Sequence, residues 1–391
     1  MKYWRGYLTA AIFGFISWAL VEFAKSHDRL IDMIYPYVTR MVQTFLAEWS
    51  SGTDLLLWQL ILLVLGIVVL ASIVLMIVMR WNPIQWLGWV LAGAAIIFTL
   101  HIGIYGMNNY AGPIADDIRL TETDYTLAQL EEAAAYYRDK ANDLAGKVKR
   151  NGDGSVNFMD FDMMSTVAGA GFQSLVYDDY LSVFAGSLLP VKELGWADAF
   201  TSVGITDLHV PITGEAAVNP QTPEVAMPFT ICKALVRRMC ISIDRDALFA
   251  AYLACDANYS PEFRYSANFM AYYYCYTAIR DMNTIPSNAA MVRLDTGVND
   301  LLRNDLDSYS AFFDENLDPE KAAIADKAGS ILSDKDFNVV GNVTDLLVSW
   351  HIQEVVIPSQ VVETIPFDPL DESQVDLTVH PTPTEEVTEE E

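Results

Sequence analysis

The chain has 391 residues, with 24 Lys or Arg against 51 Asp or Glu, so its formal net charge is −27. Yet 52% of its residues are hydrophobic, and its mean hydropathy is +0.22. This apolar content excludes a chain that is disordered throughout. The charge argues against a nucleic-acid partner, because binding to phosphates needs clustered Lys and Arg.

The charge is unevenly divided along the chain. Residues 1–112 hold six cations and five anions, whereas the rest holds 18 cations and 46 anions, a net charge of −28. We therefore expect a membrane domain over residues 1–112, a solvated helical domain over 113–357 and an acidic tail over 358–391.

Three apolar runs in the first part predict transmembrane helices. The second run, Leu55–Met79, has 25 residues and no charge, enough to cross a hydrocarbon core of about 30 Å. The third, Ile84–Met107, follows the tight turn Arg80–Pro83, so the two form a hairpin. The first, Gly6–Val21, could instead be a secretory signal peptide, but no small-x-small cleavage site follows it, which favours an uncleaved helix.

The cations near the spans predict the orientation. Lys2, Arg5 and Arg80 are expected in the cytoplasm by the positive-inside rule. Residues 25–53 and everything after Tyr110 then lie outside the cell membrane, so the chain is a multi-pass protein with an extracytoplasmic domain.

The interiors of the spans give little sign of transport. The second and third spans contain no Asp, Glu, Lys or Arg, which argues against a transporter. His101, in the third span, is interpreted as a helix–helix hydrogen-bonding group rather than a proton relay.

After the membrane part, the pattern predicts a mainly α domain. Apolar residues recur at helical spacing after Thr126, which forms a capping-box pattern with Gln129. No stretch shows sustained alternation of the kind that predicts several strands. Further helices are expected at Phe158–Ala170, Asp178–Leu188, Phe229–Met239, Asp244–Asp256 and Pro261–Met282, with a last packed segment at Val343–Val356.

The C-terminal tail and the four cysteines also indicate structural features. Residues 358–391 are rich in acids and proline and contain no Lys or Arg, which predicts a disordered, solvated tail. The absence of a CxxC motif argues against a zinc ribbon. The sequence leaves two alternatives for the cysteines: they either form disulfides or are buried free thiols. The four are Cys232, Cys240, Cys255 and Cys275.

One loop has the composition of an EF-hand or dockerin-type calcium loop. Gly154 stands at its sharp turn, but Lys149 occupies its first ligand position and would repel the ion. The alternative is a Gly-rich turn with Asx caps. If the loop binds calcium weakly, the ligands are Asn151, Asp153, Ser155, Asn157 and Asp160.

A series of motifs carries a family resemblance over most of the chain. After the third span come YGMNNY and LAQLEEAAAYYRDKAND, followed by TGEAAVN, PFTIC, FRYS and VTDLLVSW. In this combination and order the chain resembles the bacterial membrane-protein family catalogued as domain of unknown function 3810. The resemblance implies a zinc-metallopeptidase-like (gluzincin-like) helical domain on a membrane anchor.

The implied catalytic motif is degenerate in this chain. In the family, HExxH follows PFT-x-C, and its two His hold zinc while its Glu activates water. The resemblance places Lys233 and Arg237 at the two His positions, Ala234 at the Glu position and Asp246 at the third-ligand position. Two cations repel zinc and a methyl group cannot act as a base, so no catalytic residues are assigned. Neither zinc nor another cofactor is expected, apart from weakly bound calcium.

Two expectations concern what replaces the metal. We expect Arg237, with Lys233, to supply positive charge in its place and Asp246 to pair with Arg237. The alternative is that Lys233, Arg237 and Arg238 form a solvated helix face. The surviving framework residues either line a groove for a peptide or wall component or only pack: Glu215, Asn219, Arg264, Tyr265 and Ser266.

Together these observations predict a pseudoenzyme. The expected function is binding, regulation or scaffolding at the cell surface by an inactive homologue of a zinc metallopeptidase. Its expected partners are the lipid bilayer and a peptide, a cell-wall component or an active relative. The alternatives are a hydrolase that uses a carboxylate such as Glu215 without zinc and, second, a component of a transport complex.

Overall fold

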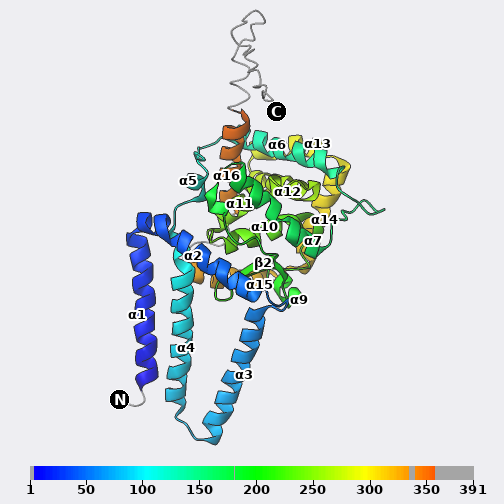
Figure 1. Ribbon diagram of the computed structural model, residues 1–391. Coiled ribbons are helices and arrows are strands. Elements are labelled where there is room, and N and C mark those ends of the chain that lie inside the picture. Colours follow the sequence, from blue (N-terminus) through cyan, green and yellow to red (C-terminus); the bar gives the residue numbers. More distant parts are fainter. Residues whose placement is uncertain (1–3, 180, 334–339, 357–391) are drawn as a thin grey trace, which may run out of the picture.

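The computed structural model describes residues 4–179, 181–333 and 340–356, and it places a globular part above three long helices (Figure 1). These helices are α1 (Arg5–Ser26), α3 (Leu57–Val78) and α4 (Pro83–Ile104). All three are long and apolar enough to cross a membrane, which confirms the predicted spans. The predicted tail over residues 358–391 lies outside the described residues.

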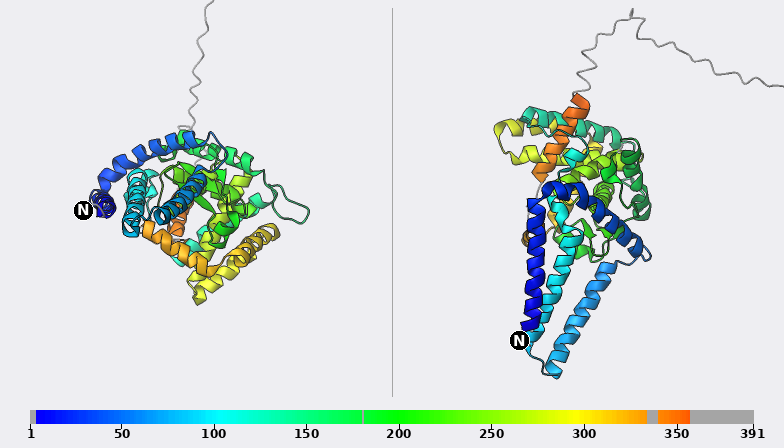
Figure 2. Two further views of the ribbon diagram at one scale, coloured as in Figure 1. Left: turned by 90° about the horizontal axis from the view of Figure 1, so that it is seen from below. Right: turned by 60° about the vertical axis from the view of Figure 1, so that its left-hand side comes forward.

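Two of the spans pack closely because small residues line their contact. A Cβ on Gly6 of α1 would come within 2.4 Å of the backbone of Gly88 in α4, so only glycine permits this approach. Further along, Ser17 Oγ lies 2.7 Å from Thr99 Oγ1. Such packing favours a retained helix over a cleaved signal peptide. α3 stands apart from this pair (Figures 1 and 2).

A helix that was not predicted, α2 (Asp28–Ser50), lies across the ends of the spans and beneath the globular part. Only His27 separates it from α1, and a short loop leads from it to α3. Seen from below, α2 runs along the edge of the globular part (Figure 2).

The globular part is mainly α, as expected. Its centre is formed by α10 (Met227–Arg238), α11 (Asp244–Asp256) and α12 (Pro261–Asp281), all close to their predicted bounds. α6 (Leu127–Ala145) packs along α12, and its predicted capping box between Thr126 and Gln129 is present. The segment predicted at 343–356 is α16 (Val340–His351), followed by a π-helical turn, η5 (Ile352–Val356).

Other helical predictions were less accurate. The helix expected at 158–170 is two helices, α7 (Phe161–Val167) and α8 (Gly169–Tyr177). The helix expected at 178–188 is wrong: within its described residues only the 3₁₀ turn η3 (Ser182–Phe184) is helical. Besides α2, the helices not predicted are η2 (Gly106–Tyr110), α5 (Ile114–Asp117), α9 (Ala197–Ser202), η4 (Glu224–Ala226), α13 (Ile285–Thr296), α14 (Asp300–Asn316) and α15 (Pro319–Ser333).

A small sheet lies between the spans and the helical core. Its strands are β1 (Lys192–Glu193), β2 (Asp207–Val210) and β3 (Glu215–Val218). β3 is central, parallel to β1 and antiparallel to β2. The TGEAAVN motif is therefore largely this central strand, whose four residues are all buried.

The core joins α6, α10, α11, α12 and α16 around large aromatic side chains. Tyr137, Phe249 and Phe263 are fully buried there. The four cysteines are buried and free, as the thiol alternative predicted.

Candidate functional site: a buried charge cluster

Four charged side chains meet where the resemblance places a metal. Lys233 and Arg237 are one turn apart on α10, so they share a face of the helix. That face meets Asp207, the first residue of β2, and Asp244, the first residue of α11. Lys233 Nζ lies 3.2 Å from Asp207 Oδ1 and 3.6 Å from Asp244 Oδ1. Arg237 Nε lies 3.3 Å from Asp207 Oδ2, and its guanidinium also donates to Asp244. We call these four residues the charge cluster.

The charge cluster is nearly buried and formally neutral. Its side chains are only 4% to 19% exposed, so each cation depends on the two carboxylates for compensation. Burial opposes ionisation of Asp244, but Lys233 and Arg237 hold the pKa of its carboxyl below the ordinary value. Burial likewise opposes the charge of Arg237, yet Asp244 and Asp207 raise its pKa. Asp244 and Arg237 are therefore both charged at neutral pH.

The predicted partner of Arg237 was wrong. Asp246 is buried, but its carboxylate accepts a hydrogen bond from the backbone N–H of Ile114 (3.1 Å) and pairs with Arg245 Nε (3.1 Å). Burial raises the pKa of Asp246, and the contacts with Ile114 and Arg245 only partly oppose this. Asp244 and Asp246 are two positions apart on α11, so their side chains leave the helix in different directions.

The alternative of a solvated helix face was also wrong. Arg238 is 3% exposed and donates to the carbonyl oxygens of Ser187 (3.1 Å) and Leu189. Burial lowers the pKa of Arg238 to about 10. Ala234, where the resemblance places a general base, is fully buried in the core.

The charge cluster lies next to the membrane end of the domain. Tyr105, the residue after α4, donates its hydroxyl to the carbonyl of Arg237 (3.0 Å). Its ring lies 5.1 Å from that of His209 on β2, measured between centroids. Burial, with Arg238 and Arg237 nearby, lowers the pKa of His209 to about 3, so this imidazole is neutral. The ring Nδ1 lies 3.1 Å from the carbonyl of Glu215.

Glu215 is an anchor for a transmembrane helix. Its buried carboxylate accepts the backbone N–H groups of Leu57 (2.8 Å) and Trp58 (2.9 Å), the first two residues of α3. Lys192 Nζ pairs with the same carboxylate at 2.8 Å. A carboxylate at a helix N-terminus satisfies free N–H groups and complements the helix dipole. The Glu of TGEAAVN thus ties the sheet to α3, a role that sequence reasoning missed.

The other predicted groove residues do not converge. Asn219 is buried and bonds Thr201 Oγ1 at 2.8 Å. Tyr265 donates to Asp305, and the hydroxyl of Ser266 accepts the N–H of Phe229 (3.2 Å). Arg264 is exposed. These contacts hold loops and helices together, and the groove stays a prediction.

The residues of the predicted calcium loop bond to one another and to nearby backbone groups. Asn151 Nδ2 donates to Ser155 Oγ (2.9 Å), and Asp153 accepts the backbone N–H of Ser155 (3.0 Å). Asp160 caps α7 through the N–H of Met163 (2.9 Å), and Asn157 donates its own N–H to Lys149 (2.9 Å). The arrangement is an Asx-capped turn between Arg150 and Val156. Calcium binding here stays a prediction.

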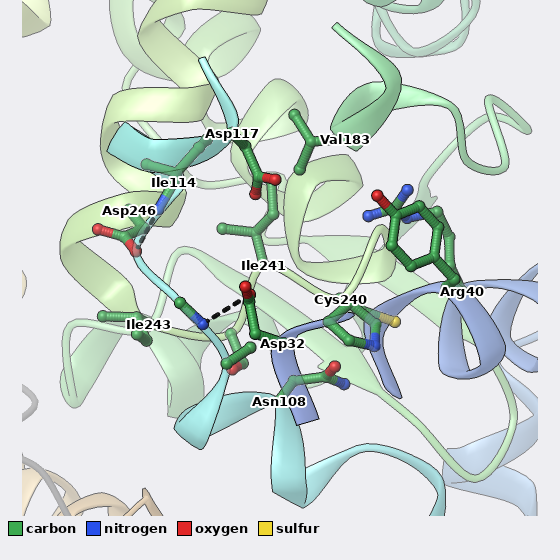
Figure 3. Close-up of a pocket in the computed structure, with 15 residues that line it drawn as sticks. Asp32, Arg40, Asn108, Ile114, Asp117, Val183, Cys240, Ile241, Ile243 and Asp246 are labelled. Carbon is green, nitrogen blue, oxygen red and sulfur yellow. Dashed lines mark hydrogen bonds between the residues drawn. The ribbon is translucent and has the colours of Figure 1, made fainter. Parts of the chain in front are cut away.

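A pocket lies at the junction of the domain and α2 (Figure 3). It holds about 40 Å³ and is lined by residues of α2, by the segment after α4 and by the α10–α11 connection. Asp246 lies here rather than in the charge cluster, and Asp32 and Asp117 also line it. Asp32 accepts the N–H of Gly112 (2.9 Å). Burial, with Asp32 close by, raises the pKa of Asp117.

The donors present do not fit zinc. In the part of the chain that the structure describes, no three His, Cys, Asp or Glu side chains are grouped so that they could hold a metal ion. The charge cluster offers only two carboxylates, and each is already engaged by two cations. The ion pairs hold α10, α11 and β2 together. The same cations and carboxylates are also chemically able to pair with the charged groups of a ligand.

The fold and the site define a mainly α domain on a helical membrane anchor. Its charge cluster holds two cations paired with two carboxylates, and it lies next to the domain-side end of α4. The chain belongs to the family described as Protein of unknown function (DUF3810), whose model matches residues 31–327. Comparison with curated proteins and with solved structures found no match.

Proposed function

We propose that this protein is a membrane-anchored, non-hydrolytic relative of zinc metallopeptidases that binds a partner or acts as a scaffold at the cell surface. The observation that supports this most is the charge cluster. Lys233 and Arg237, at the positions that the resemblance assigns to metal ligands, pair with Asp207 and Asp244. A zinc ion would have to displace two cations from carboxylates that hold them in a poorly solvated site, which costs several kcal/mol.

The position of the charge cluster limits which kinds of partner can reach it. The backbone carbonyl of Arg237 accepts a hydrogen bond from Tyr105 at the end of α4. A ligand that reaches the charge cluster would therefore bind close to the membrane surface. A peptide segment or wall component near the membrane, or an active relative in the same membrane, fits this position. The proposed orientation keeps Arg80 in the cytoplasm and the domain outside the cell.

The carboxylate-based hydrolase has less support. Its candidate, Glu215, holds the N-terminus of α3 and Lys192, so it is not free to act on a substrate. The transport alternative has no charged residue inside α3 or α4 to support it.

Hydrolysis by the full-length protein tests the proposal. The protein in detergent micelles is incubated with a peptide library, with added zinc and with a zinc chelator. No chelator-sensitive cleavage is expected from either the wild type or Asp244→Asn. Cleavage that the chelator stops and Asp244→Asn abolishes would show that the cluster is catalytic and would overturn the proposal.

A further inference from the structure

The two faces of α2 have the reverse of the usual polarity. Of its six buried residues, four are polar or charged (Thr39, Arg40, Gln43 and Ser50) and two are apolar (Ile31 and Ala47). Its exposed side chains are mostly apolar, and the charged ones lie near its ends: Asp28, Arg29, Asp32 and Glu48. A helix packed on a protein in water buries its apolar side chains and exposes its polar ones. The exposed apolar side chains, 41% to 74% accessible, are Leu30, Met33, Ile34, Tyr37, Val38, Met41, Phe45 and Trp49.

The buried polar face is firmly docked on the domain. Arg40 Nε donates to the carbonyl of Met239 and its Nη1 to that of Ser182, both at 3.1 Å. Gln43 Nε2 donates to the carbonyl of Pro211 at 3.2 Å. These contacts fix the rotation of α2, so its apolar face must point away from the domain.

The spans fix the height of α2. It begins one residue after α1 ends and finishes shortly before α3 begins. Because α1 and α3 both have their domain-side ends there (Figure 1), both ends of α2 are held on the domain's side of the spans. Its 23 residues span about 35 Å at 1.5 Å per residue, and Asp28, Arg29 and Glu48 argue against a fourth span.

We propose that α2 lies in the plane of the bilayer interface, with its apolar face among the lipid acyl chains of the leaflet on the domain's side. The occupant of this face is lipid, because the face is continuous with the lipid-facing surfaces of the spans at both ends. Trp49 and Tyr37 suit the interfacial layer, where a ring can be buried while its polar group stays wet. Trp196, 57% exposed and edge-on to Trp58 at 5.8 Å between centroids, extends the same layer toward α3.

As a consequence, the globular domain contacts the membrane surface directly through α2, instead of standing away from it on the spans alone. The polar face of α2 holds Met239 through Arg40, and Met239 directly follows α10, the helix of the charge cluster. The interfacial helix therefore sets the height and tilt at which the charge cluster stands above the lipid head groups.

Fluorescence quenching in liposomes tests this. Single cysteines replace Met41 and Phe45 on the apolar face and Ser308 on the exposed surface of α14, and each carries an environment-sensitive dye. The four native cysteines are buried, and labelled wild type gives their background. We expect lipids spin-labelled near the head group to quench the dye on Met41→Cys and Phe45→Cys several-fold more than on Ser308→Cys. Aqueous iodide should show the opposite order.

Two results would overturn the proposal. Iodide quenching on Met41→Cys as strong as on Ser308→Cys would place α2 in water. Protection from both quenchers would mean that protein, such as a second copy of the chain, covers the face.

Discussion

At the scale of residues, the charge cluster shows how the fold keeps two cations at a poorly solvated place. The sequence predicted that Lys233 and Arg237 share a helix face, because this follows from a four-residue spacing. It could not predict Asp207 as their partner. Asp207 lies 26 residues before Lys233 on a strand of four residues, and no periodicity connects the two segments.

Removing one carboxylate should destabilise the domain. Asp207→Asn leaves Lys233 and Arg237 with one buried anion between them, so we expect a loss of about 3 kcal/mol in the free energy of unfolding. Chemical denaturation in detergent measures it. Asp281→Asn breaks the exposed pair with Arg280, whose side chains are 54% and 63% accessible, and should cost at most about 1 kcal/mol. Equal effects of the two substitutions would contradict the burial of the charge cluster.

His209 should make stability depend on pH. Burial first, and then Arg238 and Arg237, lower its pKa from 6.5 to about 3 in the folded protein. Between these values the unfolded chain binds a proton that the folded chain does not, so stability falls as pH falls below about 6.5.

The His209→Gln variant isolates this contribution. Below about pH 6, the wild type should lose up to about 1.4 kcal/mol more per pH unit than the variant. Unfolding free energies measured from pH 7.5 to 5 give both slopes. Parallel slopes would mean that the imidazole is protonated in the folded domain.

At the scale of elements, the spans and central helices were predictable because their signals are local. Long apolar runs predict α1, α3 and α4, and helical spacing with Pro261 near a helix start predicts α12. α2 also had a local signal, since its apolar residues recur from Leu30 to Trp49 at helical spacing. Pro36 lies inside this helix and interrupts the signal, because proline in a helix interior removes a backbone hydrogen bond and is normally taken as a helix end.

The link between β3 and α3 was beyond prediction from the sequence. Glu215 caps a helix that begins 158 residues earlier, so only the folded structure shows it. The same holds for β1, whose two residues are too few to give an alternating pattern.

Glu215→Gln should loosen this link. The amide keeps one acceptor for the N-terminus of α3 but turns an N–H toward the other donors, and the ion pair with Lys192 is lost. We expect a cost of about 2 kcal/mol, seen as a lower melting temperature and as faster proteolysis in the loop between α2 and α3. Glu193→Gln, an exposed change on the neighbouring strand, should have little effect. If the two variants behave alike, Glu215 does not anchor α3.

At the scale of the whole molecule, the negative charge and the apolar surface belong to different parts. The spans carry the apolar residues, and the acidic excess lies after residue 112. The proposed orientation puts the acidic part outside the cell. A membrane-impermeant maleimide on intact cells should label Ser308→Cys on α14 but not Arg80→Cys in the hairpin turn until the membrane is opened. The reverse pattern would invert the topology.

Zinc occupancy tests the central claim, that ion pairs stand where the resemblance to zinc metallopeptidases would place a metal. The full-length protein in detergent is stripped of metal, dialysed against zinc at neutral pH, and its metal content is measured by mass spectrometry beside that of Asp207→Asn. The account predicts no stoichiometric zinc in the wild type. One zinc per chain that is lost in Asp207→Asn would contradict it.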